Sequence, residues 1–346
     1  MDGRSMRVTR FWRVCLGMAL GLPVLATAQA EPLSVPALQV TAPNGARSIL
    51  LAGLQRPATG LLIPAPWIVQ NKTRLVLTLD SASEPHPFEP GPSYVDPAAL
   101  AETGRSGGLG RAPWAKALRD TQMAQMRTNA RCFIKQAAEE AGQPEDPALD
   151  ASDAEYWLRL AVGGRDPYFA LALASSHCVP KGVRSREFVL RQAAVAARIP
   201  IVALDSTDQV YARYWSAPVS LLAKLLYQYA LTPAAAQGLE RAVEALNQGD
   251  FAGMARGFLA EGLTESEQKR LDRLLVFDAV DAMLPRLKPY LDEGNALVVF
   301  DASKLGGEYG LMRALTQAGY TLQPIGLPAE YEPAVLPGAG GEGRGR

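Results

Sequence analysis

Histidine side chains, the commonest metal ligands in proteins, are scarce in this sequence. Only His86 and His177 occur among its 346 residues, far apart and outside any His-Glu-x-x-His motif. A zinc site generally uses about four histidine, cysteine or carboxylate ligands. We therefore expect no metal site, with His86 in a solvated proline-rich loop and His177 in a structural or capping position.

Nucleophilic catalysis by serine or cysteine is equally unsupported. The spacing Gly-x-Ser-x-Gly occurs only at 104–108, in a stretch rich in Gly, Pro and Ser that we interpret as a loop, and Ser-x-x-Lys occurs only at 266–269. Cys132 and Cys178 form an even pair once Cys15 near the amino terminus is set aside. We predict that they form a disulfide, which leaves neither thiol available as a nucleophile.

Carboxylates are the remaining candidates for chemistry. Asp80, Asp205 and Asp301 each follow a short apolar run, in the segments RLVLTLD, IVALD and ALVVFD. Two carboxylates at a suitable distance are enough for acid/base or glycosidase chemistry. Aspartates at such positions also cap the turn or helix that follows, and we favour the capping interpretation.

The segment 295–325 shows which elements would position these groups. An apolar run (296–300) precedes a turn with two glycines (301–307), a helical stretch (311–317), Gly319 and a second apolar run (320–325). This succession predicts strand, loop, helix and strand, which is typical of an α/β fold. In such folds the loops at the carboxyl ends of the strands usually bind the ligand.

Similar patterns predict the rest of the fold. We expect further strands at 48–53, 74–80 and 201–204, and we interpret residues 31–47 as a proline-containing lead-in. Residues 210–291 are almost wholly helical in pattern. The sequence therefore predicts a central, mostly parallel sheet with packed helices and a long helical insertion before the last strands.

The order of these segments resembles the TraB/GumN family, to which the Tiki metalloproteases are related. That family has a Gly-Thr-x-His turn after its first strand, where Gly53 matches the glycine. A later strand ends in Leu-Glu and continues to a glutamine, which Asp205 and Gln209 match approximately. A final block combines a Gly-x-x-His turn, a helix and Gly-Tyr, and the sequence keeps that frame up to Gly319 and Tyr320.

The sequence departs from the family pattern where the reactive residues would be. Arg56 and Lys304 occupy the positions of the two turn histidines, and Thr78 replaces a strand glutamate, while Asp80 matches the aspartate two residues later. In the family these histidines and this glutamate would form the metal or catalytic centre. Because a cation repels a divalent ion, the resemblance implies a degenerate site with neither metal nor cofactor.

The amino-terminal residues predict export. Four arginines precede the apolar run 14–25, and Ala28-Gln29-Ala30 provides a small-x-small cleavage site, so we interpret residues 1–30 as a signal peptide. The expected location is the periplasm or the extracellular space, where disulfides persist. Residues 31–328 would form one domain, and residues 329–346 a flexible tail rich in glycine.

Composition narrows the range of partners. The chain is 48% hydrophobic and 20% charged with no net charge, and it has no dense basic stripe, so we expect no nucleic-acid partner. After signal cleavage no segment is long enough to span a membrane.

The function that we predict is an exported TraB/GumN-like pseudoenzyme that binds a peptide, glycan or protein in the former active cleft. Two alternatives remain: a metal-independent hydrolase that uses the strand-end aspartates, and a metalloprotease that recruits His86 or His177.

The positions expected to line that cleft come from all of these strand ends. They are Gly53, Arg56, Thr78, Asp80, Asp205, Gln209, Asp301 and Lys304.

Overall fold

The computed structural model describes residues 33–80, 111–140, 147–164, 167–257 and 262–330. The chain divides into two compact units, residues 1–32 and 33–346, and every described residue belongs to the second. The predicted signal peptide, His86 and most of the predicted tail lie outside the described residues. No described helix is both long and apolar enough to cross a membrane.

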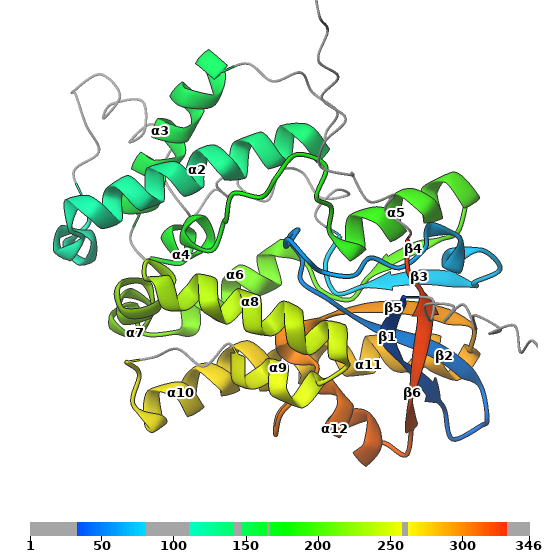
Figure 1. Cartoon of the computed structure of the whole chain (residues 1–346). Coiled ribbons are helices and arrows are strands. Elements are labelled where there is room, and N and C mark those ends of the chain that lie inside the picture. Colours follow the sequence, from blue (N-terminus) through cyan, green and yellow to red (C-terminus); the bar gives the residue numbers. More distant parts are fainter. Residues whose placement is uncertain (1–32, 81–110, 141–146, 165–166, 258–261, 331–346) are drawn as a thin grey trace, which may run out of the picture. The chain divides into compact units, whose positions relative to one another are not determined.

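Six strands form one sheet in the order β4-β3-β5-β2-β1-β6 (Figure 1). They are β1 (Ser34–Thr41), β2 (Arg47–Gly53), β3 (Arg74–Leu77), β4 (Ile201–Ala203), β5 (Ala296–Asp301) and β6 (Thr321–Pro328). The neighbours from β4 to β2 run parallel, whereas β1 pairs antiparallel with both β2 and β6. The predicted α/β fold with a mostly parallel sheet is confirmed.

The strand β1 corrects the sequence interpretation of residues 31–47 as a lead-in. This segment pairs along its whole length with β6, from Ser34 opposite Pro328 to Thr41 opposite Thr321. Its prolines conceal a strand whose Val35, Ala37, Leu38 and Val40 are all buried. Because β6 lies near the other end of the chain, this pairing forms only when distant segments meet, and local sequence patterns do not indicate it.

Both faces of the sheet are buried, so the inner strands are apolar at nearly every position. In β5, Val298 and Phe300 pack on one face, while Leu297 and Val299 pack on the other. The first face is covered by α8 (Pro233–Gln248), α9 (Phe251–Gly257), α11 (Asp278–Glu293) and α12 (Leu311–Gln317). The second is covered by α5 (Arg186–Ala197) and the short helix η1 (Pro66–Val69).

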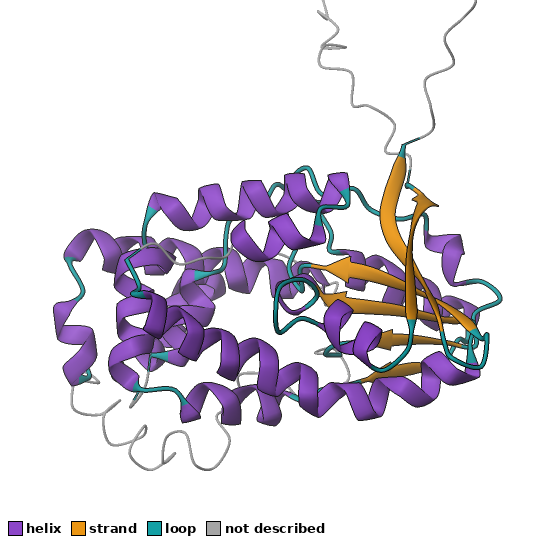
Figure 2. Cartoon of the chain, turned by 90° about the horizontal axis from the view of Figure 1, so that it is seen from below, coloured by secondary structure: helices purple, strands orange, loops and turns teal. Residues whose placement is uncertain are grey.

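A third apolar core lies among helices alone, away from the sheet (Figure 2). Its members come mainly from η2 (Pro113–Ala117), α2 (Asp120–Glu140), α3 (Pro147–Gly163), α4 (Tyr168–Ala174) and α7 (Val219–Leu225). The predicted disulfide is present: Cys132 in α2 bonds to Cys178, with 5.0 Å between the Cα atoms. This bond ties α2 to the segment that follows α4.

The predicted helical insertion before the last strands is also confirmed. Between β4 and β5 the chain forms α6 (Thr207–Ser216), α7, η3 (Leu226–Ala230), α8, α9, α10 (Glu265–Asp272), η4 (Arg273–Phe277) and α11. The elements η3 and η4 are π-helical turns that continue α7 and join α10 to α11. The insertion therefore provides helices on one side of the sheet's carboxyl edge.

Candidate functional site

The carboxyl ends of four parallel strands meet at one edge of the sheet. Gly53 at the end of β2 pairs in register with Asp301 at the end of β5, and Leu77 of β3 is level with Ala203 of β4. Beyond these ends lies a cavity of about 1050 Å³, which is lined by the strand-end loops, by α4 and by helices of the insertion. The place is the one expected for a ligand in an α/β fold.

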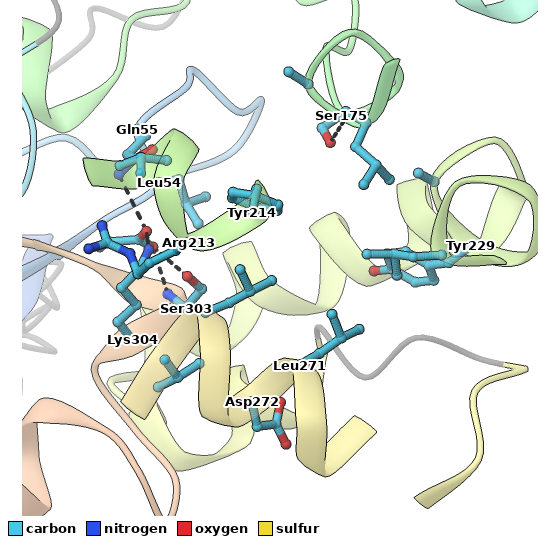
Figure 3. A pocket seen from close by; sticks show the side chains of 18 of the residues that line it. Leu54, Gln55, Ser175, Arg213, Tyr214, Tyr229, Leu271, Asp272, Ser303 and Lys304 are labelled. Carbon is cyan, nitrogen blue, oxygen red and sulfur yellow. Dashed lines mark hydrogen bonds and ion pairs between the residues drawn. The ribbon is translucent and has the colours of Figure 1, made fainter. Parts of the chain in front are cut away.

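The cavity brings together five of the eight positions expected from the sequence. Its lining includes Arg56, Thr78, Asp205, Asp301 and Lys304. Figure 3 shows Lys304 beside Gln55, Arg213 and Ser303, on the opposite side of the cavity from Tyr229. The other three positions, Gly53, Asp80 and Gln209, are not among the described residues that line it.

Asp301 is the centre of the hydrogen bonds at the strand ends. Its Oδ1 accepts from the Ser303 backbone N–H (2.9 Å) and hydroxyl (2.7 Å), so the carboxylate caps the short helix η5 (Ala302–Lys304). Its Oδ2 accepts from Gln55 Nε2 (3.3 Å) and from the Lys304 ammonium. Its backbone N–H donates to Thr78 Oγ1 (2.7 Å). Thus three of the predicted positions form one connected group.

This environment keeps Asp301 ionised. Burial alone would raise the pKa of Asp301, but the Lys304 ammonium and the hydrogen bonds from Ser303 outweigh it and hold the pKa below its ordinary value. A carboxylate with a lowered pKa is a weak base near neutral pH. The structure is therefore consistent with the capping role that the sequence suggested for this aspartate.

The other two strand-end aspartates are also ion-paired. Asp205, whose side chain is 2% exposed, contacts the guanidinium of Arg213 in α6. Asp80, with a side chain 8% exposed, accepts from Arg191 Nε of α5 at 2.8 Å. Gln209 completes the capping box at the start of α6 and accepts from Arg286 Nη1 at 2.9 Å. Asp80 and Gln209 thus connect the sheet edge to its helices.

Arg56 reaches away from the strand ends towards α4. Its Nη1 donates to the carbonyl of Ala172 (2.9 Å) and to the hydroxyl of Ser176. His177 lines the cavity beside it, and burial together with the positive charge of Arg56 lowers the pKa of His177. This histidine is therefore neutral at pH 7.

Gly53 owes its importance to a residue that the sequence interpretation missed. A Cβ atom built on Gly53 would lie 1.9 Å from Oε1 of Glu187, which is far closer than any real contact. That oxygen accepts from the Gln55 backbone N–H (3.1 Å), while Oε2 is buried without a hydrogen-bond partner. Burial raises the pKa of Glu187, although backbone hydrogen bonds to its ionised form act in the opposite direction.

The turn that Glu187 holds has an unusual backbone. Gln55 has a φ of +31°, a region that residues other than glycine rarely occupy. From this position the Gln55 backbone contacts Glu187 and its side chain contacts Asp301. The glutamate gave no signal in the sequence, because an acidic residue in the first turn of a helix is common for electrostatic reasons alone.

Another buried charge lies next to Glu187. Arg186 is fully buried, donating to the carbonyls of Leu62 (2.8 Å) and Ala52 (2.7 Å), and its Nη2 has no hydrogen-bond partner. Burial lowers the pKa of Arg186 to about 10, so it remains charged at neutral pH. Through Ala52 this arginine fixes the end of β2 just before Gly53.

The side chains at the strand ends do not provide the ligands of the metal centre that the family resemblance implies. Arg56 and Lys304 have no lone pair available while they are protonated, and Thr78 already accepts from the Asp301 backbone. Both oxygens of Asp301 are engaged by other groups. Across the described residues, no three histidine, cysteine or carboxylate side chains are close enough together to hold a metal ion.

The far side of the cavity is apolar. The lining there includes Leu225, Leu239, Leu263, Leu271, Leu275 and Val276, together with Tyr229, whereas Tyr214 lies near the charged groups at the sheet. The mouth carries charged and polar groups of α10 and of the loop after β5, including Glu265, Lys269 and Glu308. The cavity thus has an ion-paired end at the sheet and an apolar end among the helices.

Comparison with known proteins places this geometry in a family context. The sequence model of the TraB/PrgY/gumN family matches residues 116–324, which is more than half of the chain. Asp205, Gln209, Asp301 and Lys304 lie inside that region, whereas the loops after β2 and β3 precede it. No curated protein and no solved structure matches the chain significantly.

Proposed function

This chain belongs to the TraB/PrgY/gumN family, and on that premise we propose that it is an exported pseudoenzyme. It binds a peptide, glycan or protein partner in the cavity at the strand ends. The observation that carries the proposal is the group formed by Thr78, Asp301 and Lys304. Thr78 and Lys304 stand where the family pattern supplies metal-binding or catalytic side chains, and both are bonded to Asp301 instead.

Electrostatics supports the loss of the metal. At about 4 Å, even with an effective dielectric constant near 20, a unit positive charge opposes a divalent ion by several kcal/mol. Lys304 also neutralises Asp301, the carboxylate that would otherwise compensate such an ion. A metal would have to displace this pair and receive no histidine in return.

Export rests on the sequence of residues 1–30 and is supported by the Cys132–Cys178 bond, since such bonds persist in oxidising compartments. Mass spectrometry of the exported protein should find an amino terminus at Glu31. A mature protein that begins at Met1 would contradict this part of the proposal.

Elemental analysis tests the central claim. The purified parent should hold no stoichiometric zinc or manganese, whereas a triple variant with Arg56→His, Thr78→Glu and Lys304→His should gain metal affinity. A control with Arg56→Gln, Thr78→Ser and Lys304→Gln removes the same cations without adding strong ligands, and it should bind no metal. If the parent instead holds about one metal ion per chain, the stoichiometry of a true zinc site, the pseudoenzyme proposal is wrong.

A metal-independent hydrolase is the second candidate, because Asp205 and Asp301 line one cavity. Their ion pairs with Arg213 and Lys304 weigh against either acting as a free base. Turnover of a panel of peptides and glycosides, lost in both Asp205→Asn and Asp301→Asn, would favour the hydrolase. Binding without turnover would favour the pseudoenzyme.

A further inference from the structure

The apolar end of the cavity is built with features that the pseudoenzyme proposal does not explain. Two π-helical turns, η3 and η4, both contribute to its wall, through Tyr229 and Ala230 of η3 and Leu275 and Val276 of η4. Such turns are rare and occur often at functional sites. Two of them facing one cavity indicate that this end is shaped for a ligand.

The apolar wall also keeps accessible surface that a ligand would cover. Leu225, Leu239, Leu263, Leu275 and Val276 all line the cavity and are only partly buried, although each packs against a core cluster. Covering apolar surface contributes roughly 25 cal/mol per Å². A ligand would therefore gain free energy by placing an apolar segment against this wall.

A peptide backbone does not suit this wall. Each buried N–H and C=O group that lacks a hydrogen-bond partner costs free energy. The wall's main side chains are aliphatic, and two of its polar side chains already have protein partners: Ser175 Oγ donates to the Leu171 carbonyl (2.7 Å), and Asp272 Oδ1 accepts from Gln268 Nε2 (2.8 Å). A hydrocarbon chain makes no such demand.

The opposite end of the cavity selects the head group. Lys304 is paired with Asp301 and Arg213 with Asp205, while Arg56, a third cation in the lining, donates to the Ala172 carbonyl and the Ser176 hydroxyl. A charged head would lie beside a like charge or have to break a pair. A hydroxyl or amide group can donate to a carboxylate and accept from a cation at the same time.

We propose that the cavity binds a neutral amphiphile, with its hydrocarbon chain in the wall formed by η3 and η4 and its hydroxyl- or amide-bearing head at the two ion pairs. Acylglycerols and alkyl glycosides belong to this class. The inference keeps the cavity of the proposed function as the binding site, but it replaces the peptide, glycan or protein ligand by an amphiphile of one chemical type. It assigns the helical insertion the role of receiving the chain.

Fluorescence of N-phenylnaphthylamine, an uncharged probe that brightens in apolar surroundings, tests the chain site. The purified protein should bind the probe, and Ala230→Phe should weaken that binding at least about tenfold because the new ring occupies space at the apolar wall. Gln237→Phe, on the exposed side of α8, is the matched control and should bind as the parent does. Equal binding by parent and Ala230→Phe would overturn the chain site.

Displacement of the probe tests the head group. Monolauroylglycerol should displace it at concentrations about tenfold lower than dodecanoate or dodecylammonium, which have the same chain and a charged head. Free glycerol should not displace it. In Asp301→Asn, which leaves Lys304 without its carboxylate, dodecanoate should overtake monolauroylglycerol. A general loss of structure would weaken the binding of both amphiphiles and would not reverse which of them displaces the probe better.

The outcomes separate this inference from the proposed function. If charged amphiphiles displace the probe best in the parent, or if the parent binds no probe, the amphiphile inference fails while elemental analysis still decides the pseudoenzyme. If the parent holds a stoichiometric metal yet binds monolauroylglycerol as described, the pseudoenzyme fails and the ligand class stands.

Discussion

Replacing Gly53 by alanine should disrupt the contact between β2 and α5. The added Cβ would lie 1.9 Å from Oε1 and 2.6 Å from Cδ of Glu187, and 2.9 Å from Cγ1 of Val299. The carboxylate cannot simply swing aside, because it accepts from the Gln55 backbone and its other oxygen is buried. The methyl group must therefore expel the carboxylate or shift the strand.

The size of the effect follows from three contributions. Overpacking a well-packed site costs about 1–3 kcal/mol. Losing a hydrogen bond to a charged acceptor costs about 1.5–3 kcal/mol. Replacing glycine in a strand recovers at most about 1 kcal/mol of chain entropy. We expect Gly53→Ala to lower the free energy of unfolding by ~2–5 kcal/mol, which corresponds to roughly 3 to 8 °C in Tm for a domain of this size.

A double-mutant cycle with Glu187→Ala identifies the cause. Urea unfolding followed by circular dichroism should show that Gly53→Ala costs much less once the carboxylate is absent, leaving only the approach to Val299. If Gly53→Ala costs nothing in the parent, or costs the same with and without Glu187, the steric argument is wrong. Activity or binding need not be known for this measurement.

Three further changes test the charges and the cross-link. Burial raises the pKa of Glu187, so above its ordinary pKa of 4.5 the native state binds more protons than the unfolded state, and stability is lost as the pH rises through the raised pKa. In urea unfolding, Glu187→Gln should therefore gain stability relative to the parent as the pH rises above about 4.5. Arg213→Met should lower the free energy of unfolding by ~3 kcal/mol because it leaves the buried Asp205 carboxylate without its ion-pair partner. Adding Asp205→Asn should restore much of that loss in the same assay. Replacing Cys132 and Cys178 by serine removes a cross-link between residues 46 apart and should cost about 4 kcal/mol, seen as a lower Tm that reducing agent reproduces in the parent.

The sequence predicted the parallel part of the fold because its elements are formed by local patterns. The helix expected at 311–317 is α12 with the same bounds, and the strand expected at 296–300 is β5 with one more residue. The strand β1 escaped prediction because Pro36 suggested a break, whereas its place between β2 and β6 depends on pairing with the far end of the chain. Long-range pairing has no local sequence signal.

The meeting of Thr78, Asp301 and Lys304 could be anticipated from the rule that parallel strands end at one edge. Their partners could not. Glu187 occupies a place where acidic residues are common in any helix, and Arg213 lies two helical turns after Asp205, in a helix whose direction the sequence does not specify. The apolar half of the cavity depends on the π-helical turns, which have no established sequence pattern.

Gly53 shows how a match to a family pattern can be misread. A glycine before a reactive turn suggests close approach of a ligand, but here it makes room for Glu187 to reach the Gln55 backbone. The glycine is thus required whether or not the turn carries a histidine, and its presence says nothing about activity. Arg56 and Lys304 are the informative positions, because a cation there changes what the cavity can bind.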